Sequence, residues 1–74
     1  MAFERGLAAL AQFAEREGHA GVPQSHVESF EGAEYPLGVW VSRRRTEFRS
    51  GKLSAERTAV LKAVPGWEWN PGRR

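Results

Sequence analysis

A helix signal ended by a glycine is the feature that most limits what this 74-residue chain can fold into. From residue 37 on, the apolar side chains Leu37, Val41 and Phe48 fall on one stripe at helical spacing. Pro36 suits the start of such a helix because its fixed φ matches the first turn. Gly51 ends the helix, because glycine enters the left-handed region without a steric cost. The segment therefore predicts one amphipathic helix and a sharp stop.

A second helix follows directly. Ser54 is a typical N-cap, and the residues after it predict a helix over 55–64 that ends before Pro65. Its inward face is expected to be Val60, Leu61 and Val64.

The N-terminal half predicts one further helix and a long connection. Residues 3–17 repeat apolar side chains in steps of three and four, and Gly18 is a natural end for this helix. Residues 18–36 hold no sustained period. We expect an ordered connection that Val22, Val27, Phe30 and Tyr35 fix onto the helices, with a short turn or strand around 25–28 as an open alternative.

These elements predict an all-α fold: a three-helix bundle with a long ordered connection between the first two helices and an aromatic C-terminal tail packed on the core. We expect a single domain over residues 1–70, and a frayed tail or linker over 71–74. The predicted core is Phe3, Leu7, Leu10, Leu37, Trp40, Val41, Phe48, Leu53, Leu61 and Trp69.

Composition excludes several classes of function. The chain has no cysteine, which removes disulfides, thiolate nucleophiles and cysteine-type zinc sites and fits the cytoplasm. No segment is apolar enough to span a membrane, and no secretion signal is present. His19 and His26 match no metal-ligand spacing, and His19 is expected to hydrogen-bond within its own turn. We expect no metal, no cofactor, no small-molecule substrate and no catalysis.

Charge is divided unevenly along the chain. Residues 1–36 carry two arginines and six glutamates, a net charge of −4, whereas residues 37–74 carry nine basic and three acidic residues, a net charge of +6. A surface built only for solubility would mix the two signs. The division predicts an acidic half and a basic half, each able to hold a partner.

The basic residues of the second half suggest a grip on nucleic acid. Arginine suits phosphate because its planar fork donates two hydrogen bonds at once. The alternative is a solvated helix face, with basic residues near a helix C-terminus. Arg44 falls on the apolar stripe, so it must reach solvent along Trp40 and Phe48 or pair with a glutamate. The candidate nucleic-acid-binding residues are Arg43, Arg45, Arg49, Lys52, Arg57 and Trp67.

The order of several short motifs resembles the helicase-associated domain, a family of small helical modules, often in tandem, in bacterial helicase-like proteins. The motifs are Gly18-His19-x-x-Val22-Pro23, Leu37-Gly38-x-Trp40-Val41, Arg45, Gly51-Lys52-Leu53-Ser54-x-Glu56-Arg57, Leu61 and Gly66-Trp67-x-Trp69. Two positions depart from the family pattern. Phe3 stands where a tryptophan is common, and Arg44 stands where a glutamine is common.

The resemblance implies a non-catalytic module that binds DNA or RNA for an attached helicase motor or alongside tandem copies. No phosphate-binding loop of an ATPase is present in the chain. The alternative is a protein–protein docking module whose acidic N-terminal half contacts a motor domain or a neighbouring repeat. Charge reversal in one half or the other would distinguish the two.

Overall fold

The computed structural model describes residues 2–69, and within them it contains three helices and one two-stranded antiparallel sheet. Their order is α1 (Ala2–Glu17), β1 (Glu28–Phe30), β2 (Ala33–Tyr35), α2 (Leu37–Arg49) and α3 (Ala55–Lys62). The sheet corrects the all-α prediction. Around 25–28, where a short turn or strand was left open, the structure has a turn at residues 24–25, and β1 follows from Glu28. The tail expected over 71–74 lies outside the described residues.

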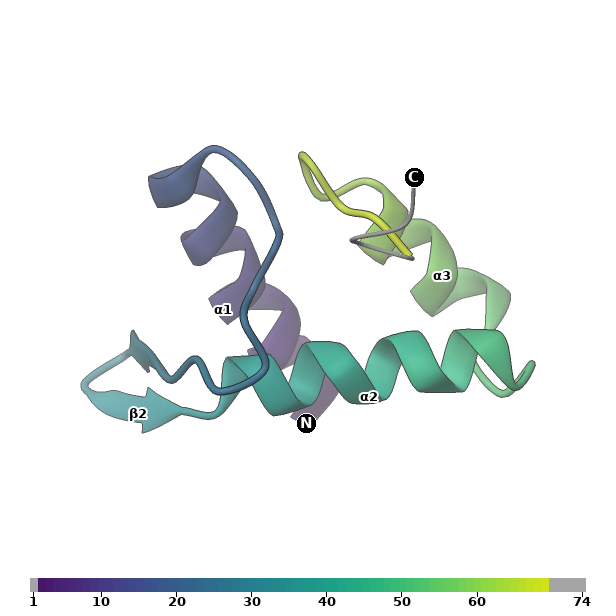
Figure 1. Cartoon of the computed structure of the whole chain (residues 1–74), viewed down its shortest axis with the longest axis horizontal. Coiled ribbons are helices and arrows are strands. Elements are labelled where there is room, and N and C mark those ends of the chain that lie inside the picture. Colours follow the sequence, from purple (N-terminus) through teal and green to yellow (C-terminus); the bar gives the residue numbers. More distant parts are fainter. Residues whose placement is uncertain (1, 70–74) are drawn as a thin grey trace.

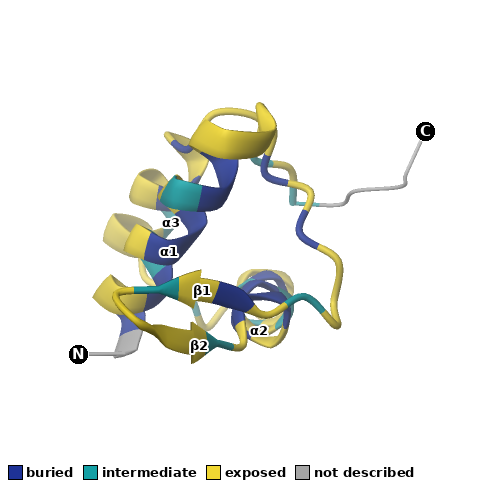
Figure 2. Cartoon of the chain, turned by 90° about the vertical axis from the view of Figure 1, so that its left-hand side faces the viewer, coloured by how far each residue is buried: buried dark blue, intermediate teal, exposed yellow. Residues whose placement is uncertain are grey.

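The helices form two layers. Figure 1 shows α2 running along the longest dimension of the molecule, with α1 and α3 beside each other and across it. In Figure 2 the layer of α1 and α3 stands on one side and α2 is seen end-on at the other, while the hairpin of β1 and β2 closes the near end. Helix α2, which carries the three consecutive arginines, therefore has one face on the core and one face exposed to solvent.

Local capping explains where the helices end. Gly18, Gly51 and Gly66 all have positive φ, at 80°, 74° and 78°. After α2, the backbone N–H of Gly51 donates to the backbone carbonyl of Phe48, and that of Lys52 donates to the backbone carbonyl of Glu47. These are the paired bonds of a Schellman motif. Ser54 caps α3, because its hydroxyl accepts a 3.1 Å hydrogen bond from the backbone N–H of Arg57.

A two-residue turn joins the strands of the hairpin. Phe30 pairs with Ala33, so Glu31 and Gly32 form the turn, with φ of 53° and 78°. Positive φ at both positions is the pattern of a type I′ turn, in which glutamate is an unusual first residue. Sequence reasoning missed this hairpin because Glu-Gly is a weak turn signal and each strand has only three residues.

Replacing Glu31 with asparagine is expected to raise the free energy of unfolding by about 0.5 kcal/mol, because asparagine tolerates the left-handed region and favours type I′ turns. The change also removes the exposed ion pair of Glu31 with Arg5, which is worth little in water. Urea unfolding of both proteins measures the difference. A lower stability would show that the ion pair outweighs the turn.

The core lies between the two helical layers. Of the ten predicted core residues, six are buried and three are half-buried against them, namely Leu7, Leu53 and Trp69. Phe48 is the correction: it is 39% exposed, because it lies near the end of α2, where it stacks on Trp69 instead of entering the core. Val27 and Val60, expected to face inward, are also exposed, at 50% and 39%.

One buried carboxylate fixes the hairpin to α1. Glu28 is 1% exposed and accepts two hydrogen bonds from Arg16, at 2.7 and 3.0 Å, in a bidentate pair. Gln12 donates to the same carboxylate at 2.6 Å, and His26 Nε2 lies 2.7 Å from it. Burial of a carboxylate is costly unless it is fully paired, and here it is.

Candidate nucleic-acid interface

The three consecutive arginines of α2 have three different environments. One turn of a helix distributes neighbouring side chains around its axis, so Arg43, Arg44 and Arg45 cannot share a face. Arg43 is exposed, Arg44 is half-buried and Arg45 is buried. The run therefore supplies one free guanidinium.

Arg44 lies between the core and solvent, as the apolar stripe requires. Its guanidinium lies 5.3 Å from the centre of the Trp40 ring and donates a 2.9 Å hydrogen bond to Glu47. Both expected solutions, contact with an aromatic ring and pairing with a glutamate, occur together. This pair also uses the carboxylate of Glu47.

Arg45 does not point outward, which corrects its expected orientation. It is 9% exposed, its Nε donates to the backbone carbonyl of Glu68 at 2.9 Å, and its guanidinium lies 4.7 Å from the Trp67 ring centre. Burial lowers the pKa of this guanidinium because the charged form loses water. In this position Arg45 joins the C-terminal segment to α2 and presents no free fork to a phosphate.

The exposed face of α2 and the turn that follows it carry further basic groups. Arg43, Thr46, Arg49, Ser50 and Lys52 are all exposed. We call these five residues the basic strip. None of its three basic residues has an ion-pair partner in the described part of the chain, and Arg49 makes only a 3.4 Å hydrogen bond to the Thr46 hydroxyl. The strip can present two guanidinium groups, an ammonium group and a hydroxyl to an anion.

Sequence reasoning missed the hydroxyl residues of the strip. Thr46 lies between Arg43 and Arg49 on a helical projection, and that spacing was the available signal. Ser50 is less free, because its hydroxyl donates to the backbone carbonyl of Thr46 at 2.7 Å.

Arg57 and Trp67 lie apart from the basic strip. The Arg57 guanidinium sits 4.4 Å from the ring centre of Phe3, so the structure places it against α1. Trp67 is half-buried, between the guanidinium of Arg45 and the edge of Trp69, and its indole nitrogen is buried without a partner among the described residues.

A small aromatic cluster ends beside the strip. Phe48 stacks on Trp69 with ring centres 4.1 Å apart and planes 14° from parallel, and Trp69 meets Trp67 edge-on at 5.1 Å. Stacking of this kind stabilises the contact beyond what burial of the two rings contributes. The cluster holds the C-terminal segment against α2, so that Arg45 stays covered.

The described residues contain no group of three or more side chains suited to a metal ion. His19 accepts a 3.0 Å hydrogen bond from the backbone N–H of Gly21, within its own turn. His26 contacts Glu28 and the edge of the Phe13 ring. No helix among the described residues is both long and apolar enough to cross a bilayer.

Comparison with known families identifies this architecture. No curated protein and no solved structure matches the chain. A family model described as the helicase associated domain matches residues 1–70, a segment that includes all the described helices and strands and the whole basic strip. The chain therefore belongs to the helicase associated domain family, whose members are accessory domains of helicases.

Proposed function

We propose that this domain is a non-catalytic nucleic-acid-binding accessory module of a larger helicase-like protein, and that the basic strip grips the phosphate backbone. The observation that carries the proposal is that the one acidic group on α2 is already paired within the helix. Glu47 is the single acidic residue between positions 37 and 54, and it is paired with Arg44. The positive charge of Arg43, Arg49 and Lys52 is therefore not neutralised on its own face.

The chemistry of the strip suits phosphate better than bases. Guanidinium forks and hydroxyls are the common donors to phosphate oxygens, and such contacts carry no sequence information. Reading of bases in the major groove commonly uses asparagine or glutamine as well as arginine, and α2 contains neither amide. We therefore expect sequence-tolerant binding.

Three basic contacts predict weak binding. Non-specific electrostatic binding has dissociation constants of about 10⁻⁴–10⁻⁶ M at physiological salt. Tandem copies, or a motor in the parent chain that binds the same strand, would raise the effective affinity without new contacts. The proposal assigns such a parent protein to the bacterial cytoplasm, where it would act on DNA or RNA.

Salt dependence tests the proposal. We expect fluorescence anisotropy with duplex and single-stranded DNA and RNA to give log–log salt slopes of about −2.7 for duplex and about −2.1 for single strands, from three phosphate contacts. The double variant Arg43→Glu/Arg49→Glu should bind about 10–100-fold more weakly and with a smaller slope, because two contacts become repulsive.

The matched control is Arg5→Glu/Lys62→Glu, which changes the net charge equally. Arg5 is on α1 and Lys62 is in the last turn of α3, so both lie outside the basic strip. We expect this control to bind almost as the unmodified domain does. Equal losses in both double variants, or binding that does not respond to salt, would contradict the proposal.

The alternative, docking of a protein partner on the acidic N-terminal half, stays a prediction. The acidic surface open to such a partner is smaller than the charge count suggests. Three of its six glutamates are paired within the domain, Glu31 with Arg5 and both Glu17 and Glu28 with Arg16. Charge complementarity is thus partly used internally, which favours the basic strip as the primary surface.

A further inference from the structure

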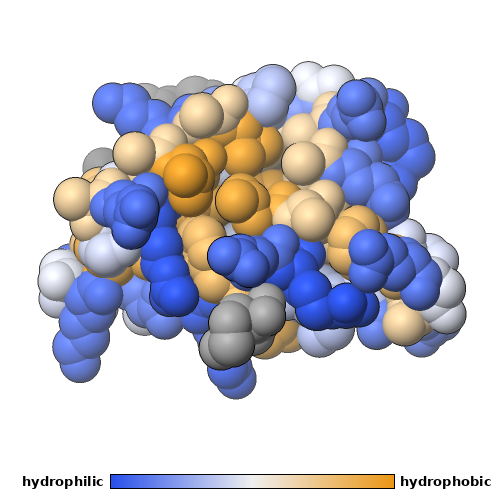
Figure 3. Space-filling view, turned by 180° about the vertical axis from the view of Figure 1, so that it is seen from behind, coloured by the Kyte–Doolittle hydropathy of each residue, from blue (hydrophilic) through white to orange (hydrophobic). Residues whose placement is uncertain are grey.

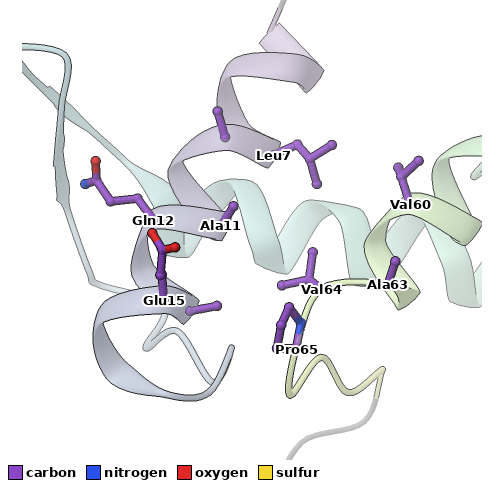
Figure 4. A pocket seen from close by; sticks show the side chains of 10 residues that line it. Leu7, Ala11, Gln12, Glu15, Val60, Ala63, Val64 and Pro65 are labelled. Carbon is purple, nitrogen blue, oxygen red and sulfur yellow. The ribbon is translucent and has the colours of Figure 1, made fainter.

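An apolar groove separates α1 from α3 on the side of the domain turned away from α2. Its volume is about 670 Å³, and its walls include Leu7 and Ala11 from α1 and Val60, Ala63 and Val64 from α3. In Figure 4, Leu7 points from α1 toward Val60, with Val64 between the helices and α2 passing behind both. Figure 3 shows an apolar patch in the middle of this face, bordered by hydrophilic side chains.

The groove continues into a second hollow. That hollow, of about 360 Å³, shares Leu7 and Val60 with the first and adds Phe3, Glu4, Glu56 and Arg57 to the walls. The two together form one channel along α1. The described part of the chain leaves this channel uncovered, and Val60 within it is 39% exposed. An apolar groove rimmed by charged side chains is a surface into which a partner helix can pack.

Unpaired carboxylates border both ends of the channel. Glu4 and Glu56 line one end and Glu15 lines the other. The single cation of the lining, Arg57, lies over the Phe3 ring at the first end, so the carboxylates outnumber it three to one. None of the three forms an ion pair with any described residue, in contrast to Glu28 and Glu31. Glu4 and Glu15 are eleven residues apart on α1, or about 16 Å at the rise of an α-helix.

The apolar walls and the acidic ends of the channel together indicate what kind of partner it binds. We propose that the channel binds an amphipathic helix of a protein partner, with aliphatic residues at i, i+3, i+4 and i+7 and a lysine or arginine toward each end of this stripe. An amphipathic helix in an apolar groove buries the stripe, while the acidic border fixes its position by charge. This inference does not depend on nucleic-acid binding by α2.

A second copy of the domain fits less well. Two channels packed face to face by twofold symmetry would bring together three carboxylates of each copy, from Glu4, Glu15 and Glu56, with one guanidinium of each, from Arg57, to offset them. The exposed face of α2 in another copy is basic, but Val39 is its single exposed aliphatic residue. Residues 70–74 contain no aliphatic side chain larger than proline and so cannot fill the channel.

An NMR titration of the 74-residue chain tests the proposal. The probe is a helical peptide of about 17 residues with leucines at i, i+3, i+4 and i+7 and two flanking lysines eleven residues apart, in an alanine and glutamine background. We expect saturable shifts at Leu7, Ala11 and Ala63, and none at Arg43. Peptides with redistributed leucines, or with glutamates in place of lysines, should bind about tenfold more weakly or not at all.

Two exposed valines provide matched variants. Val60→Glu places a carboxylate inside the channel and should weaken peptide binding by at least about tenfold. Val39→Glu makes the same change on α2, at a residue that is 42% exposed against 39% for Val60, and should leave binding unchanged. Circular dichroism confirms that both variants fold; if Val60→Glu does not, Glu15→Lys replaces it, with weaker binding of the lysine peptide expected.

Three results would overturn the proposal. One is no shift at the channel residues up to about 1 mM peptide, an affinity too weak for a specific site. Another is equal binding of the patterned and redistributed peptides. The third is self-association in sedimentation experiments that Val60→Glu abolishes, which would assign the channel to a second copy of the chain.

Discussion

The variant Gly38→Ala is expected to lose about 3 kcal/mol of stability, the upper part of the usual cost of overpacking. Gly38 is buried in the first turn of α2, where a Cβ would overlap the carbonyl oxygens of Pro23 and Gln24. Both obstacles are backbone atoms, so they cannot rotate away as a side chain can. The connection between α1 and β1 is also held at this point, because the backbone N–H of Gly38 donates to the backbone carbonyl of His26 at 3.0 Å.

Thermal unfolding followed by circular dichroism measures this loss. For a domain of this size, 3 kcal/mol corresponds to a melting temperature lower by about 12–24 °C. The control is Gly21→Ala in the same loop, where the nearest neighbour of an added Cβ is the His19 side chain, at 3.3 Å. That side chain can shift, so we expect a change within about 1 kcal/mol. Equal melting temperatures for the two variants would show that the backbone at Pro23 and Gln24 moves to make room for the added Cβ at little cost.

The helices were predictable because their signals are local. A capping serine at Ser54 and stop residues at Gly18 and Gly51 act through backbone conformation and hydrogen bonds within a few residues. The structure ends α3 at Lys62, earlier than the predicted 64, although Val64 still enters the core. Such signals fix the existence of an element better than its last turn.

The features that sequence reasoning missed depend on residues far apart in the chain. Glu28 reads as an exposed loop residue until Arg16, twelve positions earlier, is brought beside it. Arg45 reads as part of the basic face until the C-terminal segment covers it with Trp67. Its burial follows from tertiary contacts that no helical period contains.

The candidate nucleic-acid interface was likewise predictable only where its signals are local. Arg43, Arg49 and Lys52 follow from charge and helical spacing, and the structure leaves all three exposed. Arg57 belongs to the contact with Phe3 on α1. The channel between α1 and α3 was not foreseen, because Val60 was assigned to the core and a groove depends on how far two helices stand apart.

The second large effect is expected at Glu28, where replacement by glutamine should cost about 2 kcal/mol. This is less than the cost of breaking a fully buried ion pair, because the Arg16 side chain is half exposed. A glutamine keeps the shape, but it removes the charge that faces Arg16 and turns an amide N–H₂ toward one of the donors Arg16, Gln12 or His26. Urea unfolding at neutral pH measures the cost.

Glu31→Gln is the matched control for this substitution. It makes the same chemical change in the same hairpin, but the Glu31 side chain is 63% exposed and its pair with Arg5 lies in water. We expect a cost below about 1 kcal/mol, as for other surface ion pairs. Similar costs at Glu28 and Glu31 would mean that the buried network adds nothing to the fold.

The same carboxylate should make the domain less stable in acid. The hydrogen bonds from Arg16, with those from His26 and Gln12, hold the pKa of Glu28 at about 2, below the ordinary value of 4.5 expected in the unfolded chain. Because the folded state binds this proton less tightly, the contribution is complete above pH 4.5 and is lost as the pH falls toward 2. Between about pH 5 and about pH 2 the unmodified domain should lose about 2 kcal/mol more than Glu28→Gln, less than full linkage because water screens the half-exposed Arg16. Equal acid sensitivity of the two proteins in urea unfolding would assign the loss to other carboxylates.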